Sequence, residues 1–156
     1  MIYLDNAATT PMSENVKAAI RSSMDLFGNP STASAGGTAA RVAIEEARRI
    51  CAASINAEPD EIYFTSGGTE SDNWAVGMAT TGENEIALVT SEFEHRALLA
   101  RADYMIDNGM RVEYLPVSQY GAVSISSLIR ILKDYQVRLV SVMMVNNELG
   151  TIQDIE

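Results

Sequence analysis

EIALVTSEFEHRALLARADYMIDNGMRVEYL, residues 85–115, contains a complete strand–helix–strand unit. The apolar run of residues 85–90 predicts a buried strand. Residues 95–108 predict a helix that Gly109 is well placed to end, and residues 111–115 predict the next strand. Because two strands joined through a helix lie parallel in one sheet, this stretch indicates an α/β fold.

The segments on either side continue the alternation. Residues 61–65 and 138–145 predict two more strands, and residues 69–78 and 126–133 predict two more helices. We therefore expect an α/β fold with a mostly parallel sheet flanked by helices. The last strand is apolar over nearly its whole length, which is typical of a strand covered on both faces. No closing helix follows it, so we also expect a sheet edge and one face to be bare.

The N-terminal part of the chain is expected to be helical. Ser13 offers a helix start ahead of apolar residues at helical spacing, and Gly28, followed by Asn and Pro, ends that helix. Residues 31–38 are interpreted as a loop, and residues 39–55 predict a second helix with its charges turned to water. No repeat, low-complexity tract or proline-rich linker divides the chain, so residues 1–156 are expected to form a single module.

Composition argues against several classes of function. The 156 residues carry 11 Lys and Arg against 21 Asp and Glu, and this net charge of -10 disfavours nucleic acids and anionic membranes as partners. The longest apolar run, residues 139–145, is far shorter than the roughly 20 residues that cross a bilayer. The N-terminus lacks the basic leader and apolar core of a signal peptide, and the one cysteine, Cys51, has no partner for a disulfide. We expect a cytoplasmic protein.

Polar residues follow three of the predicted strands, namely Ser66-Gly-Gly-Thr69, Glu94-His95 and Asn146-Asn147. Ligands of open α/β sheets bind beyond the carboxyl ends of the strands, so these junctions form the candidate site. The Ser-Gly-Gly-Thr turn has the attributes of a phosphate cradle, because two glycines allow close approach and a helix begins there. A tight turn before a capped helix is the alternative. The spacing fits no nucleotide motif, which argues against ATP, GTP or a dinucleotide.

The other candidate residues also have structural interpretations. His95, the only histidine, either caps or packs a helix, or stacks on a planar ring and moves a proton near neutral pH. Asn146 and Asn147 are either turn residues or uncharged hydrogen-bonding groups. Cys51 is expected to be a small core residue. One His and one Cys supply no cluster of metal ligands, so no metal site is expected.

Five short blocks are spread along the chain: Tyr3-Leu-Asp-Asn-Ala-Ala-Thr-Thr-Pro11, Phe27-Gly-Asn-Pro30, Phe64-Thr-Ser-Gly-Gly-Thr-Glu-Ser-Asp-Asn73, Glu94-His95 and Met144-Val-Asn-Asn-Glu-Leu-Gly150. In their order and spacing they resemble the pyridoxal-phosphate-dependent cysteine desulfurases of the class V aminotransferase group. Each block alone is a weak signal. Five ordered blocks along the whole chain make a specific match.

The resemblance implies the N-terminal part of the large domain of a fold type I pyridoxal-phosphate-dependent transferase. Gly68 and Thr69 resemble the residues that bind the cofactor phosphate. His95 resembles the catalytic imidazole that stacks on the pyridine ring and assists proton transfer. Asn147 resembles the amide that bonds the ring hydroxyl, and residues 7–10 would border the substrate.

The activity implied by the resemblance is removal of sulfur from L-cysteine, with pyridoxal 5'-phosphate as cofactor, to give L-alanine and a protein persulfide. The sulfur would pass to an acceptor protein and feed iron–sulfur cluster assembly, and enzymes of this family are usually homodimers. Two alternatives stay open. One is a non-catalytic interaction protein derived from such a half-domain, and the other is a different class V activity, such as selenocysteine lysis or transamination.

The sequence also departs from the family. The family's Schiff-base lysine and its nucleophilic cysteine belong to a second half that does not match any part of these residues. The lysines present, Lys17 and Lys133, are on predicted helix faces, and Cys51 is inside a helix. We therefore expect the N-terminal half of a desulfurase, as an expressed piece, a proteolytic remnant or a truncated gene product, that is inactive alone.

Overall fold

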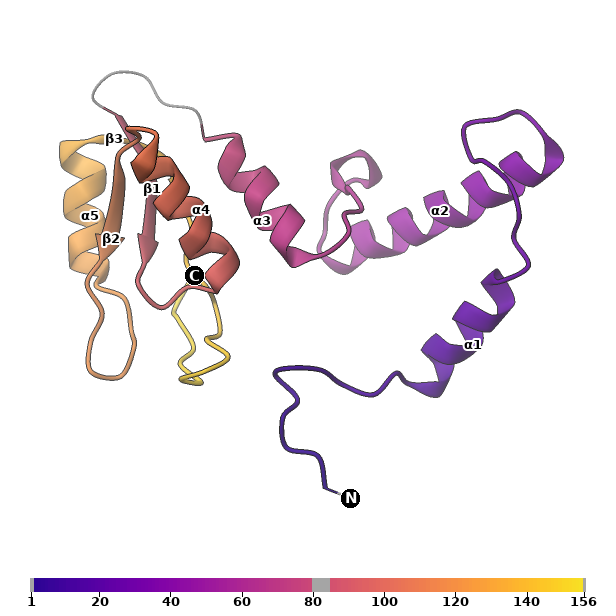
Figure 1. Ribbon diagram of the computed structural model, residues 1–156, viewed down its shortest axis with the longest axis horizontal. Helices are drawn as coiled ribbons and strands as arrows, with labels where there is room; N and C mark the ends of the chain where they lie inside the picture. The colour runs from indigo at the N-terminus through magenta and orange to yellow at the C-terminus, as the bar shows by residue number, and fades with distance from the viewer. Residues whose placement is uncertain (1, 80–84, 156) are drawn as a thin grey trace. The chain divides into compact units, whose positions relative to one another are not determined.

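The computed structural model describes residues 2–79 and 85–155 (Figure 1). Contacts within the chain divide it into two compact units, Met1–Phe64 and Thr65–Glu156. Each unit is described by itself. The single module expected from the sequence stays a prediction.

The C-terminal unit contains a three-stranded parallel sheet in the order β2-β1-β3, with β1 at Glu85–Ser91, β2 at Val112–Leu115 and β3 at Gln136–Val140. Leu88 of β1 pairs with Val112 on one side and with Leu139 on the other. Six consecutive residues of β1 are buried, because strands flank it and helices cover both of its faces. The predicted mostly parallel α/β sheet is confirmed.

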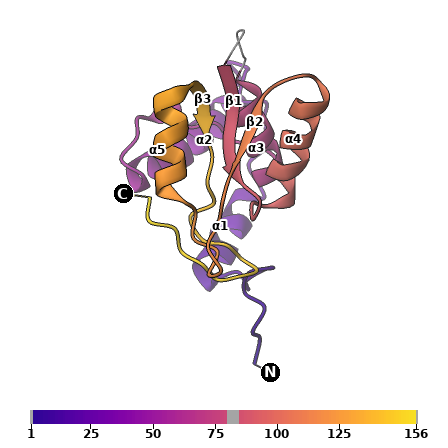
Figure 2. The same ribbon diagram turned by 90° about the vertical axis from the view of Figure 1, so that its left-hand side faces the viewer.

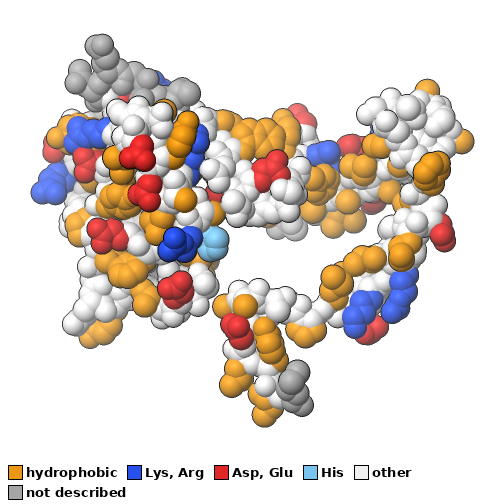
Figure 3. Space-filling view, viewed as in Figure 1, with side chains coloured by type: hydrophobic (Ala, Val, Ile, Leu, Met, Phe, Trp, Pro, Cys, Tyr) orange, Lys and Arg blue, Asp and Glu red, His pale blue; other side chains and the backbone are white. Residues whose placement is uncertain are grey.

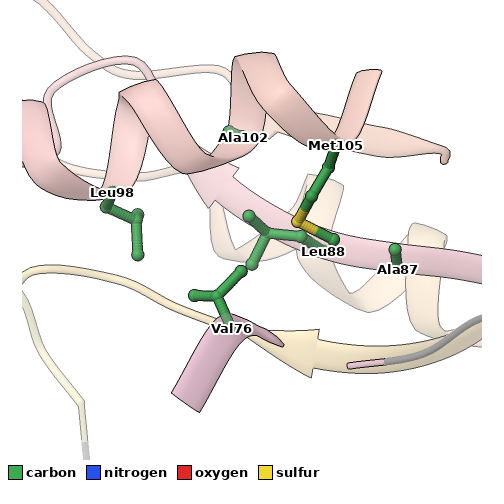
Figure 4. Packing of buried hydrophobic residues seen from close by; sticks show 6 residues of the cluster. All are labelled: Val76, Ala87, Leu88, Leu98, Ala102 and Met105. Atoms are coloured by element: carbon green, nitrogen blue, oxygen red, sulfur yellow. The ribbon is translucent and has the colours of Figure 1, made fainter. Parts of the chain in front are cut away.

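Helices cover the sheet on opposite faces (Figure 2). One face carries α3, Gly68–Gly77, and α4, Arg96–Asp107, while α5, Ile125–Asp134, covers the other. Figure 4 shows the first of the two cores, formed by Val76, Ala87, Leu88, Leu98, Ala102 and Met105. The second core joins Ile86, Val89 and Leu115 to α5. These three helices agree with the predicted ones to within a few residues at either end.

Local signals set the ends of α4 and α5, whereas α1, Glu14–Ser23, ends ahead of the predicted end at Gly28. Gly109 has φ +77°, a left-handed conformation that suits glycine, and its N–H donates to the carbonyl of Ile106 at 2.9 Å. This ends α4 where the sequence predicted. Ser124 caps α5 by accepting from the N–H of Ser127. None of the helices in residues 2–79 and 85–155 is long and apolar enough to span a membrane.

The N-terminal unit consists of α1, Glu14–Ser23, α2, Ala35–Ser54, and a short 3-10 helix, η1, at Pro59–Glu61. The side chain of Ser13 accepts from Val16 N–H, which confirms the predicted start of α1. Helix α2 begins four residues earlier than predicted. Ser34 caps it by accepting from the N–H of Gly37, so half of the expected loop at residues 31–38 is helical.

The prediction of a strand at residues 61–65 is wrong. Glu61 ends η1, and the residues after it pair with no strand in the part of the chain that the structure describes. The carbonyl of Ile62 accepts instead from the guanidinium of Arg48, whose charge also lies 5.0 Å from the centre of the Phe64 ring. Apolar β-forming residues make a strand only where another strand offers a hydrogen-bond ladder.

The last predicted strand, residues 138–145, is partly wrong. β3 ends at Val140, and its side chains alternate between exposed and half-buried, as in a strand at the edge of a sheet. Ser141 makes one more bond to β1, through its N–H and the carbonyl of Val89 at 2.9 Å. The chain then leaves the sheet and turns back at an isolated antiparallel bridge between Val145 and Ile152.

Replacing Leu88 with Ala tests the central position of β1. Leu88 is fully buried between the sheet and α4, so we expect the free energy of unfolding to fall by about 2–5 kcal/mol. Urea unfolding followed by circular dichroism measures the loss. Leu132→Ala is the control, because that side chain on α5 is 49% exposed and its loss is expected to change stability by less than about 1 kcal/mol. Equal effects of the two substitutions would contradict the assigned core.

Candidate functional site

Two neighbouring cavities lie at the carboxyl ends of β1 and β3. The first cavity encloses about 550 Å³ and the second about 440 Å³, and both are lined by Glu94 and His95. The first is also lined by Gly68, Thr69, Asp72, Leu98, Ser141, Val142 and Met143. The second adds Asn147 and its neighbours Asn146, Glu148 and Leu149. The structure therefore brings Gly68, Thr69 and His95 to one cavity and Asn147 to the adjoining one.

The first turn of α3 forms one wall of the first cavity. The N–H groups of Gly68 and Thr69 have no carbonyl partner within the helix, because an α-helix leaves its first N–H groups unpaired. Apart from its own helical turn, no atom lies within 4 Å of the position that a Cβ on Gly68 would take. The backbone is thus open to an approaching group, and the positive end of the helix dipole favours an anion there.

The loop ahead of α3 is held in place by its own side chains. Glu70 accepts from the Ser66 N–H at 2.6 Å and from the Ser66 hydroxyl at 2.7 Å. These two hydrogen bonds lower the pKa of Glu70. The Thr65 and Ser71 hydroxyls are 2.7 Å apart across the same turn. The Ser-Gly-Gly-Thr turn is therefore both a braced helix start and an open N–H donor site.

The structure shows His95 in the capping role, and its role toward a planar ring stays a prediction. It is the N-cap of α4, and its Nδ1 accepts from the Ala97 N–H at 3.1 Å. An accepting Nδ1 places the proton of the neutral ring on Nε2. The ring itself is exposed and lines both cavities, and Figure 3 shows it in pale blue, open on the face in view. The cap fixes the imidazole, and the exposed face and Nε2–H stay free to meet a ligand.

The two asparagines have different roles. Asn146 is buried, and its Oδ1 accepts from the N–H groups of Glu148 and Leu149 at 2.9 and 2.7 Å, which is turn chemistry. Its Nδ2 donates to the carbonyl of Phe93 at 2.6 Å. Asn147 is exposed at the rim of the second cavity. Of the pair, Asn147 is the residue that can offer its amide to a ligand.

Glu94 lies at a junction that the sequence analysis selected, but no role was assigned to it there. Its Oε1 accepts from the Ser91 hydroxyl at 3.0 Å and from the Met143 N–H at 2.8 Å. Burial raises the pKa of this carboxyl, although the two hydrogen bonds oppose the shift, and the charge of Asp72 raises it slightly further. The main partner, Met143, is 49 residues away in the sequence. The only signal available was the position of Glu94 next to His95 after a strand.

The remaining candidates lie elsewhere in the chain. Residues 7–10 belong to the N-terminal unit and are exposed, and the first two lie in a turn closed by the Ala8 N–H and the Asp5 carbonyl. Their place beside a substrate stays a prediction. Cys51 is exposed on α2, so the expectation of a core residue is wrong, because its part of the helix faces solvent. Within residues 2–79 and 85–155, no group of three or more His, Cys, Asp and Glu is arranged to hold a metal ion.

Comparisons with known proteins match the chain over its whole length. A model of the class-V aminotransferase family matches residues 2–156. The cysteine desulfurase IscS of Methanosarcina thermophila is 44% identical over 158 residues, which are 99% of this chain and 39% of that protein.

Solved structures give the same result. A NifS-like protein superposes with a TM-score of 0.88 at 36% identity, covering 97% of this chain and 42% of that one. SspA in complex with cysteine superposes with a TM-score of 0.89 at 36% identity, covering 99% of this chain and 45% of that one. The chain spans less than half the length of each of these proteins. The resemblance and the fold class expected from the five blocks are confirmed, and the chain belongs to the class-V aminotransferase family.

Proposed function

We propose that this chain supplies the cofactor-phosphate part of a cysteine desulfurase. The observation that carries the proposal is the joint lining of one cavity by the open first turn of α3 and by His95. Class-V aminotransferases and cysteine desulfurases depend on pyridoxal 5'-phosphate. This cofactor has an anionic phosphate, a flat ring and polar ring substituents, and the two cavities offer a matching set of groups.

The phosphate fits the start of α3. The N–H groups of Gly68 and Thr69 and the Thr69 hydroxyl would donate to its oxygens, and the helix dipole would favour its negative charge. No lysine or arginine lines the first cavity among the described residues. Most of the hydrogen bonds from this chain to the phosphate would therefore come from backbone N–H groups.

The ring fits between His95 and Asn147. His95 would lie against one face of the ring, with Nε2 able to hold or move a proton, and Asn147 would bond the ring hydroxyl through its amide. When bound, pyridoxal phosphate supplies an electron sink for bonds broken at the α-carbon of the substrate. His95 is the catalytic residue that we assign.

L-cysteine is the proposed substrate. Support comes from the desulfurases that the chain resembles and from the structure of SspA in complex with cysteine. The products would be L-alanine and a persulfide, whose sulfur would pass to an acceptor protein for iron–sulfur cluster assembly. We propose the cytoplasm as the compartment, because the single cysteine suits a reducing environment.

A homodimer is the proposed assembly. Among the described residues of the N-terminal unit only Gly37 and Ala52 are buried, while Phe27, Val42 and Ile50 are more than half exposed. Figure 3 shows hydrophobic side chains spread over α1 and α2. Apolar surface of this extent marks an interaction site, so the same observation also favours the second candidate function, a non-catalytic interaction module. Binding of pyridoxal phosphate distinguishes the desulfurase part from the interaction module, because a non-catalytic interaction module is expected not to bind the cofactor.

Replacing Gly68 with Ala tests the phosphate site. A methyl group fits the free chain without a clash, and alanine favours a helix over glycine, so thermal stability should be kept or raised. The same methyl group would stand where the phosphate approaches, so affinity for pyridoxal phosphate should fall by about tenfold or more. Titration followed by cofactor absorbance and by the fluorescence of Trp74, the only tryptophan, measures the affinity.

Gly77→Ala is the matched control, since it makes the same change at the other end of α3. Its Cβ would meet only the flexible end of Arg101, at 3.3 Å, so stability and affinity should both stay close to those of the unchanged chain. Unaltered affinity in the Gly68 variant would show that the phosphate does not bind at the start of α3.

The 156-residue chain is expected to bind the cofactor without turnover. Lys17 pairs with Glu14 on α1 at 2.7 Å, and Lys133 is at the exposed end of α5, outside both cavities. Neither is set to hold the cofactor covalently, and Cys51 is in the last turn of α2, outside both cavities. Alanine and sulfide release from L-cysteine should therefore equal the rate of free pyridoxal phosphate at the same concentration. A higher rate would refute the expected inactivity.

A further inference from the structure

We propose that Glu94 and Asn146 are positioning residues that fasten the loop at residues 91–95 to the segment at residues 141–149, and so hold His95 and Asn147 in a fixed relation. We call the hydrogen bonds of Glu94 to Met143 and of Asn146 to Phe93 the loop clasp. The role of the loop clasp in catalysis rests on the proposed function. Its role in holding the two segments together is independent of that function.

The hydrogen bonds of the loop clasp lie just beyond the carboxyl ends of β1 and β3. β1 ends at Ser91 and β3 at Val140, and the bond from Ser141 to Val89 is the last backbone hydrogen bond between these two segments among the described residues. Past this point, the described hydrogen bonds between the segments come from the side chains of Glu94 and Asn146. These two residues thus continue the connection that the ladder no longer provides.

The two bonds run in opposite directions. Glu94 reaches from the first segment and accepts from the Met143 N–H at 2.8 Å. Asn146 reaches from the second segment and donates to the Phe93 carbonyl at 2.6 Å. Each satisfies a backbone group near the cavities for which the described residues offer no other hydrogen-bond partner. A shift of either segment along the other would stretch both bonds.

The residues that follow the clasp are the ones that face the ligand. His95 comes directly after Glu94, and Asn147 comes directly after Asn146. Both are exposed, so packing alone does not fix them. The N-cap bond of His95 orients its ring relative to α4, and the loop clasp adds the constraint relative to Asn147.

The hydrogen bonds of Glu94 require an acceptor oxygen at the position of Oε1, and the negative charge of the carboxylate is unfavourable at this half-buried position. One oxygen, Oε1, accepts both described bonds, so the carbonyl oxygen of a glutamine could replace it. Burial of the carboxyl and the nearby Asp72 both disfavour the negative charge. Replacing Glu94 with Gln therefore keeps the clasp and removes the charge, whereas replacing it with Ala removes both.

Hydrogen exchange of the free 156-residue chain tests the loop clasp directly. In the Glu94→Ala variant, protection of the Met143 amide should fall by about tenfold or more, and in Glu94→Gln it should stay near that of the unchanged chain. Affinity for pyridoxal phosphate should follow the same order, with a fall of about tenfold for Ala and recovery for Gln. Equal protection of Met143 in the Ala variant would overturn the proposal.

Asn146→Asp provides a second variant for the other half of the clasp. The carboxylate keeps an acceptor for the N–H groups of Glu148 and Leu149 but loses the donor to Phe93. Protection at Glu148 and Leu149 should persist while the affinity for pyridoxal phosphate falls by about tenfold. If this variant binds the cofactor as well as the unchanged chain, Asn146 is only a turn residue and the proposal fails for it.

The pH dependence of stability separates the effect of the Glu94 charge from the effect of packing, because packing does not change with protonation. Because burial raises the pKa of Glu94 above its ordinary value of 4.5, deprotonation costs the folded chain more than the unfolded chain. The stability of the unchanged chain relative to Glu94→Gln should therefore be constant well below pH 4.5 and fall as the pH rises from 4.5 through the raised pKa. A flat difference would contradict the burial of the carboxyl. Other charged or titratable residues that line these cavities are Asp72, Glu92, His95, Arg96 and Glu148.

The proposed function and the loop clasp fail in different ways. If the unchanged chain binds no pyridoxal phosphate while the Glu94→Ala variant loses protection at Met143, the proposed function is wrong and the clasp stands. If the unchanged chain binds the cofactor and the variants keep both protection and affinity, the clasp is wrong and the proposed function stands.

Discussion

The parallel pairing of β1 with both of its neighbours is the constraint on which the C-terminal unit depends. Because β1 lies between β2 and β3 and all three run in one direction, their carboxyl ends meet at one edge of the sheet. The loop after β1 and the segment after β3 are thereby brought together. Burial of β1 on both faces holds this arrangement, since its side chains form the centre of both hydrophobic cores.

The first cavity at that edge presents oriented neutral donors beside two carboxyl groups, those of Asp72 and Glu94. A chain with a net charge of -10 repels anions at long range, so an anion binds only where local donors outweigh the field. The first turn of α3 offers such donors, and Glu70 is turned back onto Ser66. The carboxyl of Glu94 is occupied by hydrogen bonds, and its raised pKa reflects its burial near Asp72. The same side chain that lines both cavities also holds their walls together.

The N-terminal unit lacks the extensive buried core that the C-terminal unit has. Its helices have sound local signals, with Ser13 and Ser34 as N-caps, yet it buries little of its own apolar surface. Capping stabilises helix ends by about 1 kcal/mol each, whereas a core requires apolar side chains that contact one another. The helices are thus specified locally, and their exposed apolar faces account for the interaction surface that the proposed function assigns to them.

The sequence by itself determined the elements whose signals are local: the helices with their Ser and Gly caps, the buried strand at residues 85–90 and the parallel α/β class. It also selected Gly68, Thr69, His95 and Asn147 as candidates, from their positions at predicted strand ends and helix starts and from the resemblance to the family. The tertiary structure decided the rest. Residues 61–65 have the composition of a strand but pair with no strand among the described residues, and residues 141–145 leave the sheet. Glu94 contacts the backbone of Met143, 49 residues away. Strand pairing and long-range hydrogen bonds depend on which segments meet in space, and the local pattern of residues does not contain that information.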